Sequence, residues 1–380
     1  KKIKKKKKKQ RKKFKLERKK LKNKIKIIDI YILTMKKILL LLLIYFQSCY
    51  ASAELKLGQE GNIEFDTYHS FDLSSVYEKK YLERPLKGKG KLYLPKNIGE
   101  NKVPLMILLH TSGGVKSNRE VRYAKYFNKL GYAAYIVDTY KTRKCNPSGD
   151  SGPWRNCIAK ITTIDFATDA YLALKKLSTH PNINIDKAGV IGFSYGGNAT
   201  ALVLDSKFKN IFSPNNKFIV NISVYGDCFL NYGDLKKTTG ADFHYIIGTK
   251  DLQYNKEICD KNFSKISTAG SNVIEHFLEG GVHGFEADYS LEWLPSSEYP
   301  TFTNCDLQFL NDGTYLETTT NNKIKMEANE ELKTKFKKRK KFVFKTIKKC
   351  YGRGNNIGAQ QKIFRENLEL LEKITSNYLN

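Results

Sequence analysis

The sequence predicts an α/β fold, built on a mostly parallel, doubly wound sheet with helices on both of its faces. Two observations predict this fold. Short apolar runs alternate along the chain with longer amphipathic segments, which is the pattern of strands connected by helices. The runs are also continuously apolar, as in VPLMILLH at 103–110, and strands of this kind are covered on both faces.

The elements follow one another in regular order. We expect buried strands where the short apolar runs lie, at 103–110, 133–137, 188–192, 218–225, 243–248 and 273–278. We expect helices in the amphipathic segments between and after them, at 118–130, 163–178, 195–204, 255–266 and 359–377. Gly131 ends the first of these helices, since glycine is the common residue just beyond a helix. Functional loops should lie at the carboxyl ends of the strands.

The positive charge of the chain is concentrated in two segments. The formal net charge is +29, of which residues 1–34 contribute +16 and residues 322–353 contribute +10. The part of the chain between them is close to neutral, so no nucleic-acid partner is expected. The lysine-rich run at 333–349 is interpreted as a solvated helix face, with an anionic surface or lipid partner as the alternative.

The amino-terminal segments suggest export. Residues 1–34 form a lysine-rich, low-complexity leader that we expect to be disordered and not part of the native protein, which would start at Met35. Residues 35–53 have the basic start, short apolar stretch and small-residue site of a signal peptide cleaved after Ala53. We therefore expect a periplasmic or secreted protein without a stable membrane anchor. Residues 54–380 would form a single domain, with an irregular insertion at about 286–350 and a carboxyl-terminal helix.

Six cysteines lie beyond the predicted cleavage site. An even number of cysteines outside the cytoplasm suggests disulfides, and six cysteines allow fifteen pairings. Our preferred set joins neighbours in the sequence: Cys145 with Cys157, Cys228 with Cys259, and Cys305 with Cys350. The chain has no Cys-x-x-Cys pair and no histidine cluster with metal-ligand spacing, so neither a metal nor a cofactor is expected.

The sequence GFSYGG at 192–197 lies where the expected strand at 188–192 turns into a helix. Gly-x-Ser-x-Gly at such a turn is a nucleophile elbow. The glycines at 192 and 196 allow a tight turn and a close approach of strand and helix. Ser194 would thereby be raised above the sheet, and the N–H of Tyr195 at the helix N-terminus would face a developing oxyanion. We expect Ser194 to be a nucleophile.

A serine nucleophile needs a base that is oriented by an acid, in the chain order Ser, acid, His for this type of fold. Asp251 ends a buried strand 57 residues after Ser194, and His283 lies in a glycine-flanked loop a further 32 residues on. We assign Asp251 as the orienting acid and His283 as general base and acid. Asp227, which also follows a strand, is the second choice for the acid.

The sequence HTSGG at 110–114 begins with His110, the last residue of the first expected strand. A histidine followed by small residues at this place orders the loop that supplies a second oxyanion N–H, which we assign to Ser112. We interpret the role of His110 as positional rather than catalytic.

These motifs resemble the dienelactone hydrolase family of α/β-hydrolases, particularly its exported, cysteine-containing branch. The similar segments are LLHTSGG, GYAAYIVDTYKTR, GFSYGG, GTKD and HGF, and, near the carboxyl terminus, CYGRGNNIGAQQKIFRENLELL. The resemblance implies an α/β-hydrolase fold and an esterase-type triad of Ser194, Asp251 and His283. Two departures are present: the archetypal members use cysteine at the position of Ser194, and Thr111 replaces a glycine.

The sequence therefore predicts an exported serine hydrolase that cleaves a small-molecule carboxylic ester or lactone through an acyl-enzyme. The alternatives are a peptidase of the same superfamily and a catalytically inactive binding protein on the same fold. The acyl or alcohol group of the substrate depends on loops whose packing the sequence does not reveal.

Overall fold

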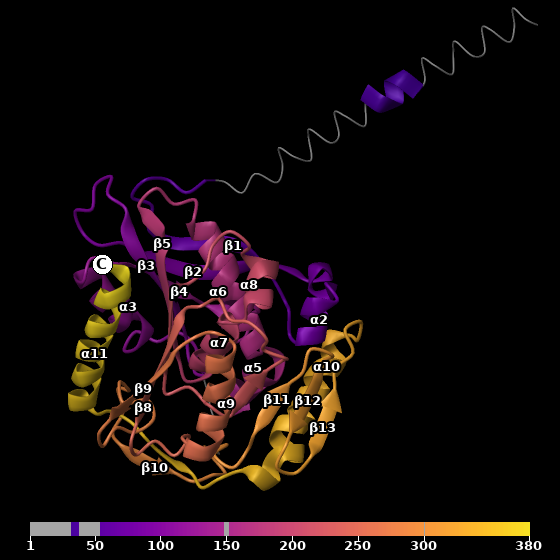
Figure 1. The fold of residues 1–380 in the computed structure, drawn as a ribbon, viewed down its shortest axis with the longest axis vertical. Coiled ribbons are helices and arrows are strands. Elements are labelled where there is room, and N and C mark those ends of the chain that lie inside the picture. The colour runs from indigo at the N-terminus through magenta and orange to yellow at the C-terminus, as the bar shows by residue number, and fades with distance from the viewer. Residues whose placement is uncertain (1–31, 38–53, 148–151, 300) are drawn as a thin grey trace, which may run out of the picture. The chain divides into compact units, whose positions relative to one another are not determined.

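An eight-stranded sheet forms the centre of the structure. We describe it from a computed structural model that covers residues 32–37, 54–147, 152–299 and 301–380 (Figure 1). The strand order is β1-β2-β4-β3-β5-β6-β8-β9. The last six strands run parallel, whereas β2 is antiparallel to both β1 and β4. The strands are β1 (Gly61–Tyr68), β2 (Pro85–Tyr93), β3 (Val103–Leu109), β4 (Ala133–Val137), β5 (Ile183–Phe193), β6 (Val220–Val224), β8 (Asp242–Gly248) and β9 (Val273–Leu278).

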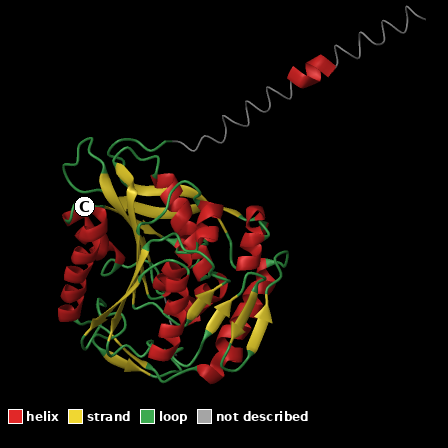
Figure 2. Ribbon diagram, in the orientation of Figure 1, coloured by secondary structure: helices red, strands yellow, loops and turns green. Residues whose placement is uncertain are grey.

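Helices cover both faces of this sheet, with α3 and α11 on one side and α6 and α7 on the other (Figure 2). The longer helices are α3 (Glu120–Lys129), α5 (Gly152–Lys160), α6 (Thr163–Leu177), α7 (Tyr195–Val203), α9 (Lys256–Thr268), α10 (Leu332–Lys341) and α11 (Gln361–Leu379). The shorter ones are α2 (Leu73–Tyr77), α4 (Thr139–Thr142) and α8 (Ser206–Phe212), with 3₁₀ turns at Lys80–Glu83 and Ile347–Cys350 and a π turn at Phe342–Thr346.

Strand β3 shows why the apolar runs form buried strands. Its side chains alternate between the two faces, so that Leu105, Ile107 and Leu109 join one core and Met106 and Leu108 join the other. All five are fully buried. A strand in this position must be apolar at every residue, because neither of its faces meets water.

The α/β-hydrolase fold predicted from the sequence is confirmed. Each of the six expected strands and five expected helices is present, with small shifts at the ends, and the strand expected at 188–192 is longer, since β5 begins at Ile183. The prediction did not include β1 and β2. Glycines at 88 and 90 weaken the strand pattern of β2, yet they are required there, because a Cβ atom would overlap the rings of Phe65 and Tyr135.

The segment at 286–350 is more regular than expected. It contributes three strands of a second, four-stranded sheet in the order β13-β12-β11-β7. A two-stranded pair, β10 with β14, lies beside the loop that carries His283. Figure 1 shows β11, β12 and β13 grouped with α10 at the lower right of the view. The bounds are β7 (Leu230–Tyr232), β10 (Glu292–Leu294), β11 (Leu307–Phe309), β12 (Thr314–Glu317), β13 (Asn322–Lys325) and β14 (Asn355–Ile357).

Three disulfides join the pairs preferred from the sequence. Cys145 bonds with Cys157, Cys228 with Cys259, and Cys305 with Cys350. The third closes the longest loop, of 45 residues, and connects the start of the second sheet to the end of the lysine-rich segment. The prediction of neighbour-to-neighbour pairing is therefore confirmed.

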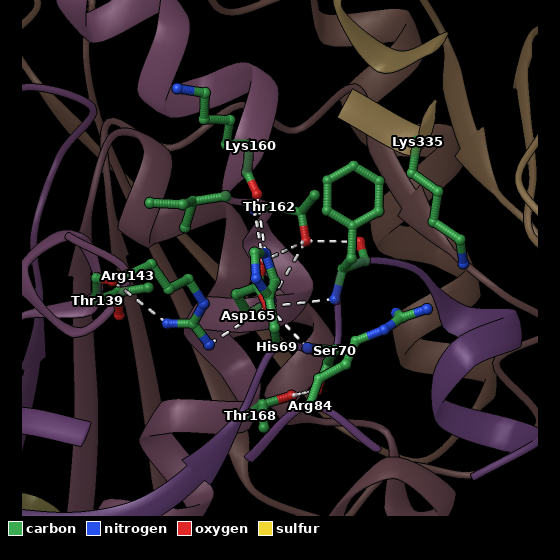
Figure 3. A network of polar contacts seen from close by, with 12 residues as sticks. His69, Ser70, Arg84, Thr139, Arg143, Lys160, Thr162, Asp165, Thr168 and Lys335 are labelled. Atoms are coloured by element: carbon green, nitrogen blue, oxygen red, sulfur yellow. Dashed lines mark hydrogen bonds and ion pairs between the residues drawn. The ribbon is translucent and has the colours of Figure 1, made fainter. Parts of the chain in front are cut away.

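A buried polar network attaches the segment after β1 to the start of α6 (Figure 3). Arg143 forms ion pairs with Asp169 at 2.7 Å and Asp165 at 3.3 Å. Asp165 also accepts hydrogen bonds from the N–H of Ser70 at 2.9 Å and of Thr162 at 2.9 Å, the latter within a capping box. Both acids of α6 are thus neutralised inside the core.

Residues Lys1–Glu54 and Leu55–Asn380 form two separate units. In the first unit, residues 32–37 are helical. Most of the predicted leader, and the predicted signal peptide from 38 to 53, lie outside the described residues. Within the part of the chain that is described, no helix combines the length and apolar character needed to cross a membrane.

Candidate active site

Ser194 lies at a strained turn between β5 and α7. Its backbone has φ of +48° and ψ of −112°, which is uncommon for a residue with a side chain. No other residue type fits at the flanking glycines. A Cβ on Gly192 would overlap the carbonyl of Gly196, and a Cβ on Gly196 would overlap the carbonyl of Leu109. The turn is therefore possible only with glycine at both places, and it has the geometry of a nucleophile elbow.

The structure brings Ser194, His283 and Asp251 into one hydrogen-bonded chain. His283 Nε2 lies 3.0 Å from Ser194 Oγ, and His283 Nδ1 lies 2.7 Å from Asp251 Oδ2. The three residues follow β5, β9 and β8, which are parallel strands of the same sheet, and so they meet at its carboxyl edge. The two side chains behind the serine are buried, with exposures of 5% for His283 and 4% for Asp251.

Two further donors hold Asp251. Its Oδ1 accepts hydrogen bonds from the N–H of Gln253 at 3.0 Å and from Nδ2 of Asn355 at 2.8 Å. These donors leave Oδ2 free to receive the Nδ1 proton of His283. Asn355 belongs to β14, far from Asp251 in the sequence, and sequence reasoning missed it. Asn355 lies in the carboxyl-terminal segment that resembles the family, but that resemblance gives the residue no role, and the pairing of β14 with β10 brings it to the site.

Asp251 also raises the pKa of His283. Burial would lower the pKa of this imidazole, but the charge of Asp251 and its hydrogen bond raise the pKa above its ordinary value of 6.5. Tyr225 packs against the same ring, with 4.8 Å between ring centroids, and its hydroxyl hydrogen-bonds with the buried Glu286. Hydrogen bonds and packing thus fix His283 on both sides.

The two residues whose N–H groups are assigned to the oxyanion line the same cavity as Ser194. Tyr195 is the first residue of α7, and Ser112 lines the same cavity as Ser194. The Thr111 side chain accepts a hydrogen bond from Gly113 N–H at 3.0 Å, and the Thr111 carbonyl accepts one from Gly114 N–H at 3.1 Å. No hydrogen bond among the described residues uses the N–H of Ser112 or Tyr195.

His110 supports this loop, as the sequence indicated. The side chain is fully buried, and its Nδ1 hydrogen-bonds with the carbonyl of Thr111 at 2.6 Å. Its ring packs edge-on against Tyr140 and Phe166, with centroid distances of 4.6 and 4.7 Å. Burial lowers the pKa of His110, which keeps the imidazole neutral.

Asp227, the second choice for the acid, does not contact Nδ1 of His283, which is bonded to Asp251. Its carboxylate instead accepts a hydrogen bond from Asn198 Nδ2 at 2.7 Å and lines the cavity beside Ser194. Burial raises the pKa of Asp227 to about 6. The sequence ranked Asp251 before Asp227 although both follow neighbouring strands, and the structure bonds Asp251 to His283.

The cavity next to Ser194 has a volume of about 100 Å³ and is lined mostly by apolar side chains. Several of these side chains come from the segment at 286–350, which the sequence analysis did not connect with the site. The apolar lining includes Ile158, Phe229, Leu230, Phe302, Leu307, Phe309, Phe342 and Val343, and the charged residues on its wall are Asp227 and Arg339. The described residues contain no group of three or more histidine, cysteine or acidic side chains arranged to hold a metal.

A sequence model of the dienelactone hydrolase family matches residues 89–306, a segment that contains Ser194, Asp251 and His283. The chain belongs to the dienelactone hydrolase family. This membership supports a hydrolase and agrees with the resemblance found in the motifs. The family match ends before α10 and β14, so Arg339 and Asn355 lie outside it.

The individual proteins to which this dienelactone hydrolase family member is similar match only part of the chain or have low sequence identity. It is 31% identical over 124 residues to an uncharacterized protein of Pseudomonas aeruginosa, which is 32% of this chain and 31% of that protein. The match thus spans about a third of the curated relative. A native esterase of Thermogutta terrifontis has a TM-score of 0.39 and 14% identity, covering 52% of this chain and 79% of that one. The same esterase phosphonylated by sarin has a TM-score of 0.40 and 14% identity, with coverages of 52% and 81%.

Proposed function

We propose that this protein is a serine hydrolase that cleaves a carboxylic ester or lactone through an acyl-enzyme. The observation that supports it most is the hydrogen-bonded chain from Asp251 through His283 to Ser194. Ser194 Oγ attacks the carbonyl carbon while His283 Nε2 takes its proton, and His283 then gives this proton to the leaving alcohol. Water repeats the sequence in the second half-reaction and releases the acid.

The other groups of the site fit this mechanism. Asp251 holds the imidazole with Nδ1 protonated, so that Nε2 is the free base, and it stabilises the imidazolium that forms. The N–H groups of Tyr195 and Ser112 would stabilise the negative oxygen of the tetrahedral intermediate, aided by the N-terminus of α7. None of these steps calls for a cofactor.

We also propose that the protein is exported and that residues 54–380 act as one domain. The three disulfides support export, because such bonds persist outside the reducing cytoplasm. The proposed signal peptide at 35–53 would direct this export. Mass spectrometry of the mature protein from the periplasm or medium should find Glu54 as its first residue, whereas retention of residues 1–34 would contradict the proposal.

Replacing Ser194 by alanine tests the function. The Ser194→Ala variant should hydrolyse p-nitrophenyl butyrate roughly 10³-fold more slowly or worse, since a residue of this kind acts as a unit with its base. The parent, but not the variant, should be labelled by a fluorophosphonate at this serine. Ser267→Ala, which changes an exposed serine of α9, is the matched control and should behave as the parent. Equal activity of Ser194→Ala and the parent would overturn the proposal, and an unlabelled parent would favour an inactive binding protein.

A further inference from the structure

Lys335 and Arg339 are buried, and the side chains of Arg143 and Arg119 are only 2% and 13% exposed. Acids neutralise three of these four cations. Arg119 forms an ion pair with Glu120 at 2.7 Å, and Arg143 pairs with Asp165 and Asp169. Lys335 pairs with Asp72 at 2.6 Å. The fourth is Arg339, which is 5% exposed. No ion pair found among the described residues involves it.

Neutral groups hold Arg339 in place. It lies on α10, where its Nε donates to the carbonyl of Ile158 at 3.0 Å and one terminal nitrogen donates to the Tyr195 hydroxyl at 3.0 Å. The Tyr195 hydroxyl donates in turn to the carbonyl of Ile161 at 2.9 Å. The guanidinium also lies 5.6 Å from the centre of the Tyr315 ring. These contacts orient the guanidinium but do not neutralise its charge.

A buried charge without a counter-ion is costly, because burial removes it from water. Arg119, Arg143 and Lys335 are each paired with carboxylates of the protein itself, which offset this cost. The position of Arg339 suggests a different partner, since it lines the cavity that contains Ser194. A counter-ion for Arg339 could therefore arrive with the substrate.

The rest of the cavity limits the shape of such a substrate. Phe302, Phe309 and Phe342 are among the apolar side chains that line it. Asp227, the acid on the wall, is hydrogen-bonded to Asn198, and no ion pair joins it to Arg339. An apolar body with an anion at one end matches this lining. Arginine presents its donors as a planar fork that fits a carboxylate.

We propose that Arg339 binds a carboxylate at the far end of an apolar ester substrate, so that the preferred substrates are half-esters of dicarboxylic acids. This inference rests on the proposed function of the site. The carboxylate bound by Arg339 takes no part in bond making. It places the ester carbonyl at Ser194, and hydrolysis converts the half-ester and water into the dicarboxylic acid and an alcohol.

Three methyl esters with acyl groups of matched length test the proposal on the unmodified protein. Monomethyl adipate carries a carboxylate where methyl hexanoate carries a methyl group, and methyl 6-aminohexanoate carries an ammonium group there. The released acid is followed in a pH-stat at pH 8. The expected order of kcat/KM is adipate above hexanoate by at least tenfold, and hexanoate above aminohexanoate. A preference for hexanoate over adipate would overturn the proposal, because an ordinary apolar pocket behaves in that way.

Variants separate recognition from a structural role of Arg339. Arg339→Gln should lower kcat/KM for monomethyl adipate ten- to a hundredfold and change that for methyl hexanoate less than threefold, whereas Arg339→Lys should recover part of the preference. Lys337→Gln removes the same charge from an exposed position of α10 and should leave the preference intact. An equal loss for both esters in Arg339→Gln would mean that the residue only supports Tyr195, which would also overturn the proposal.

A binding experiment distinguishes failure of this inference from failure of the proposed function. If the parent hydrolyses none of the three esters, the function is wrong. Calorimetry with the Ser194→Ala variant still tests Arg339, because it measures binding without turnover. Monomethyl adipate should then bind at least tenfold more tightly than methyl hexanoate, and equal affinities would exclude a carboxylate site at Arg339.

Discussion

Replacing Asp251 by asparagine should reverse the proton arrangement of the proposed triad. In the parent, Asp251 Oδ1 accepts two N–H groups, from Gln253 and Asn355. These donors remain in Asp251→Asn and require an oxygen at the same place, so the new NH₂ group must face His283 Nδ1. That nitrogen then has to accept a hydrogen bond, and the proton moves to Nε2. An Nε2 that carries a proton cannot take one from Ser194.

The expected loss is large and can be measured directly. An imidazole held in the wrong tautomer costs about 10³- to 10⁴-fold in kcat, or roughly 4 to 5.5 kcal/mol of transition-state stabilisation. The assay is kcat for p-nitrophenyl butyrate, combined with the ¹⁵N shifts of the His283 ring, which report which nitrogen carries the proton. Asp234→Asn, at an exposed position, is the matched control. Activity of Asp251→Asn within tenfold of the parent, with Nε2 still unprotonated, would refute the reasoning.

Three further predictions follow from the same structure. The kcat/KM of the parent should fall as the pH decreases through a midpoint above 6.5, because His283 is inactive when protonated and its pKa is raised; a midpoint below 6.5 in the pH–rate profile would contradict this. Asn355→Leu removes one charge-assisted hydrogen bond to Asp251 and should lower kcat roughly ten- to a hundredfold, while a melting curve shows that the variant is folded. The double substitution Cys305→Ala and Cys350→Ala opens a loop of 45 residues and should cost about 4 kcal/mol in the free energy of unfolding, measured with urea. A cost under about 1 kcal/mol would mean that chain entropy is not the main contribution of this disulfide.

The sequence was sufficient for the six parallel strands of the main sheet, and it placed the three residues of the proposed triad at the edge where the structure brings them together. The reason is that both depend on local patterns. A strand buried on two faces must be apolar throughout, as β3 is, and the turn at Ser194 admits only glycine at 192 and 196. Once the strands are known to be parallel, their carboxyl ends share one edge, and Asp251 and His283 come to the same place as the serine.

The contacts that Asn355 and Arg339 make at the site could not be predicted in this way. Asn355 lies in the segment that resembles the family near the carboxyl terminus, but that resemblance does not indicate which side chain it contacts, and no motif includes Arg339. Asn355 reaches Asp251 only because β14 pairs with β10, and Arg339 reaches the cavity only because α10 packs against α5. In the sequence, Arg339 is one basic residue in a run of lysines, and its exposed neighbour Lys337 has the same composition around it.

The proposed catalytic residues and the cavity wall come from different parts of the chain. The residues proposed to make and break bonds lie on strand ends of the main sheet, inside the family match, whereas much of the cavity wall comes from the segment at 286–350. That segment is held by a disulfide and by its own small sheet, so its side chains can change without disturbing the turn at Ser194. Changes in this segment should therefore alter which esters are accepted, as expected for Arg339, whereas changes at the strand ends should alter the rate for every ester.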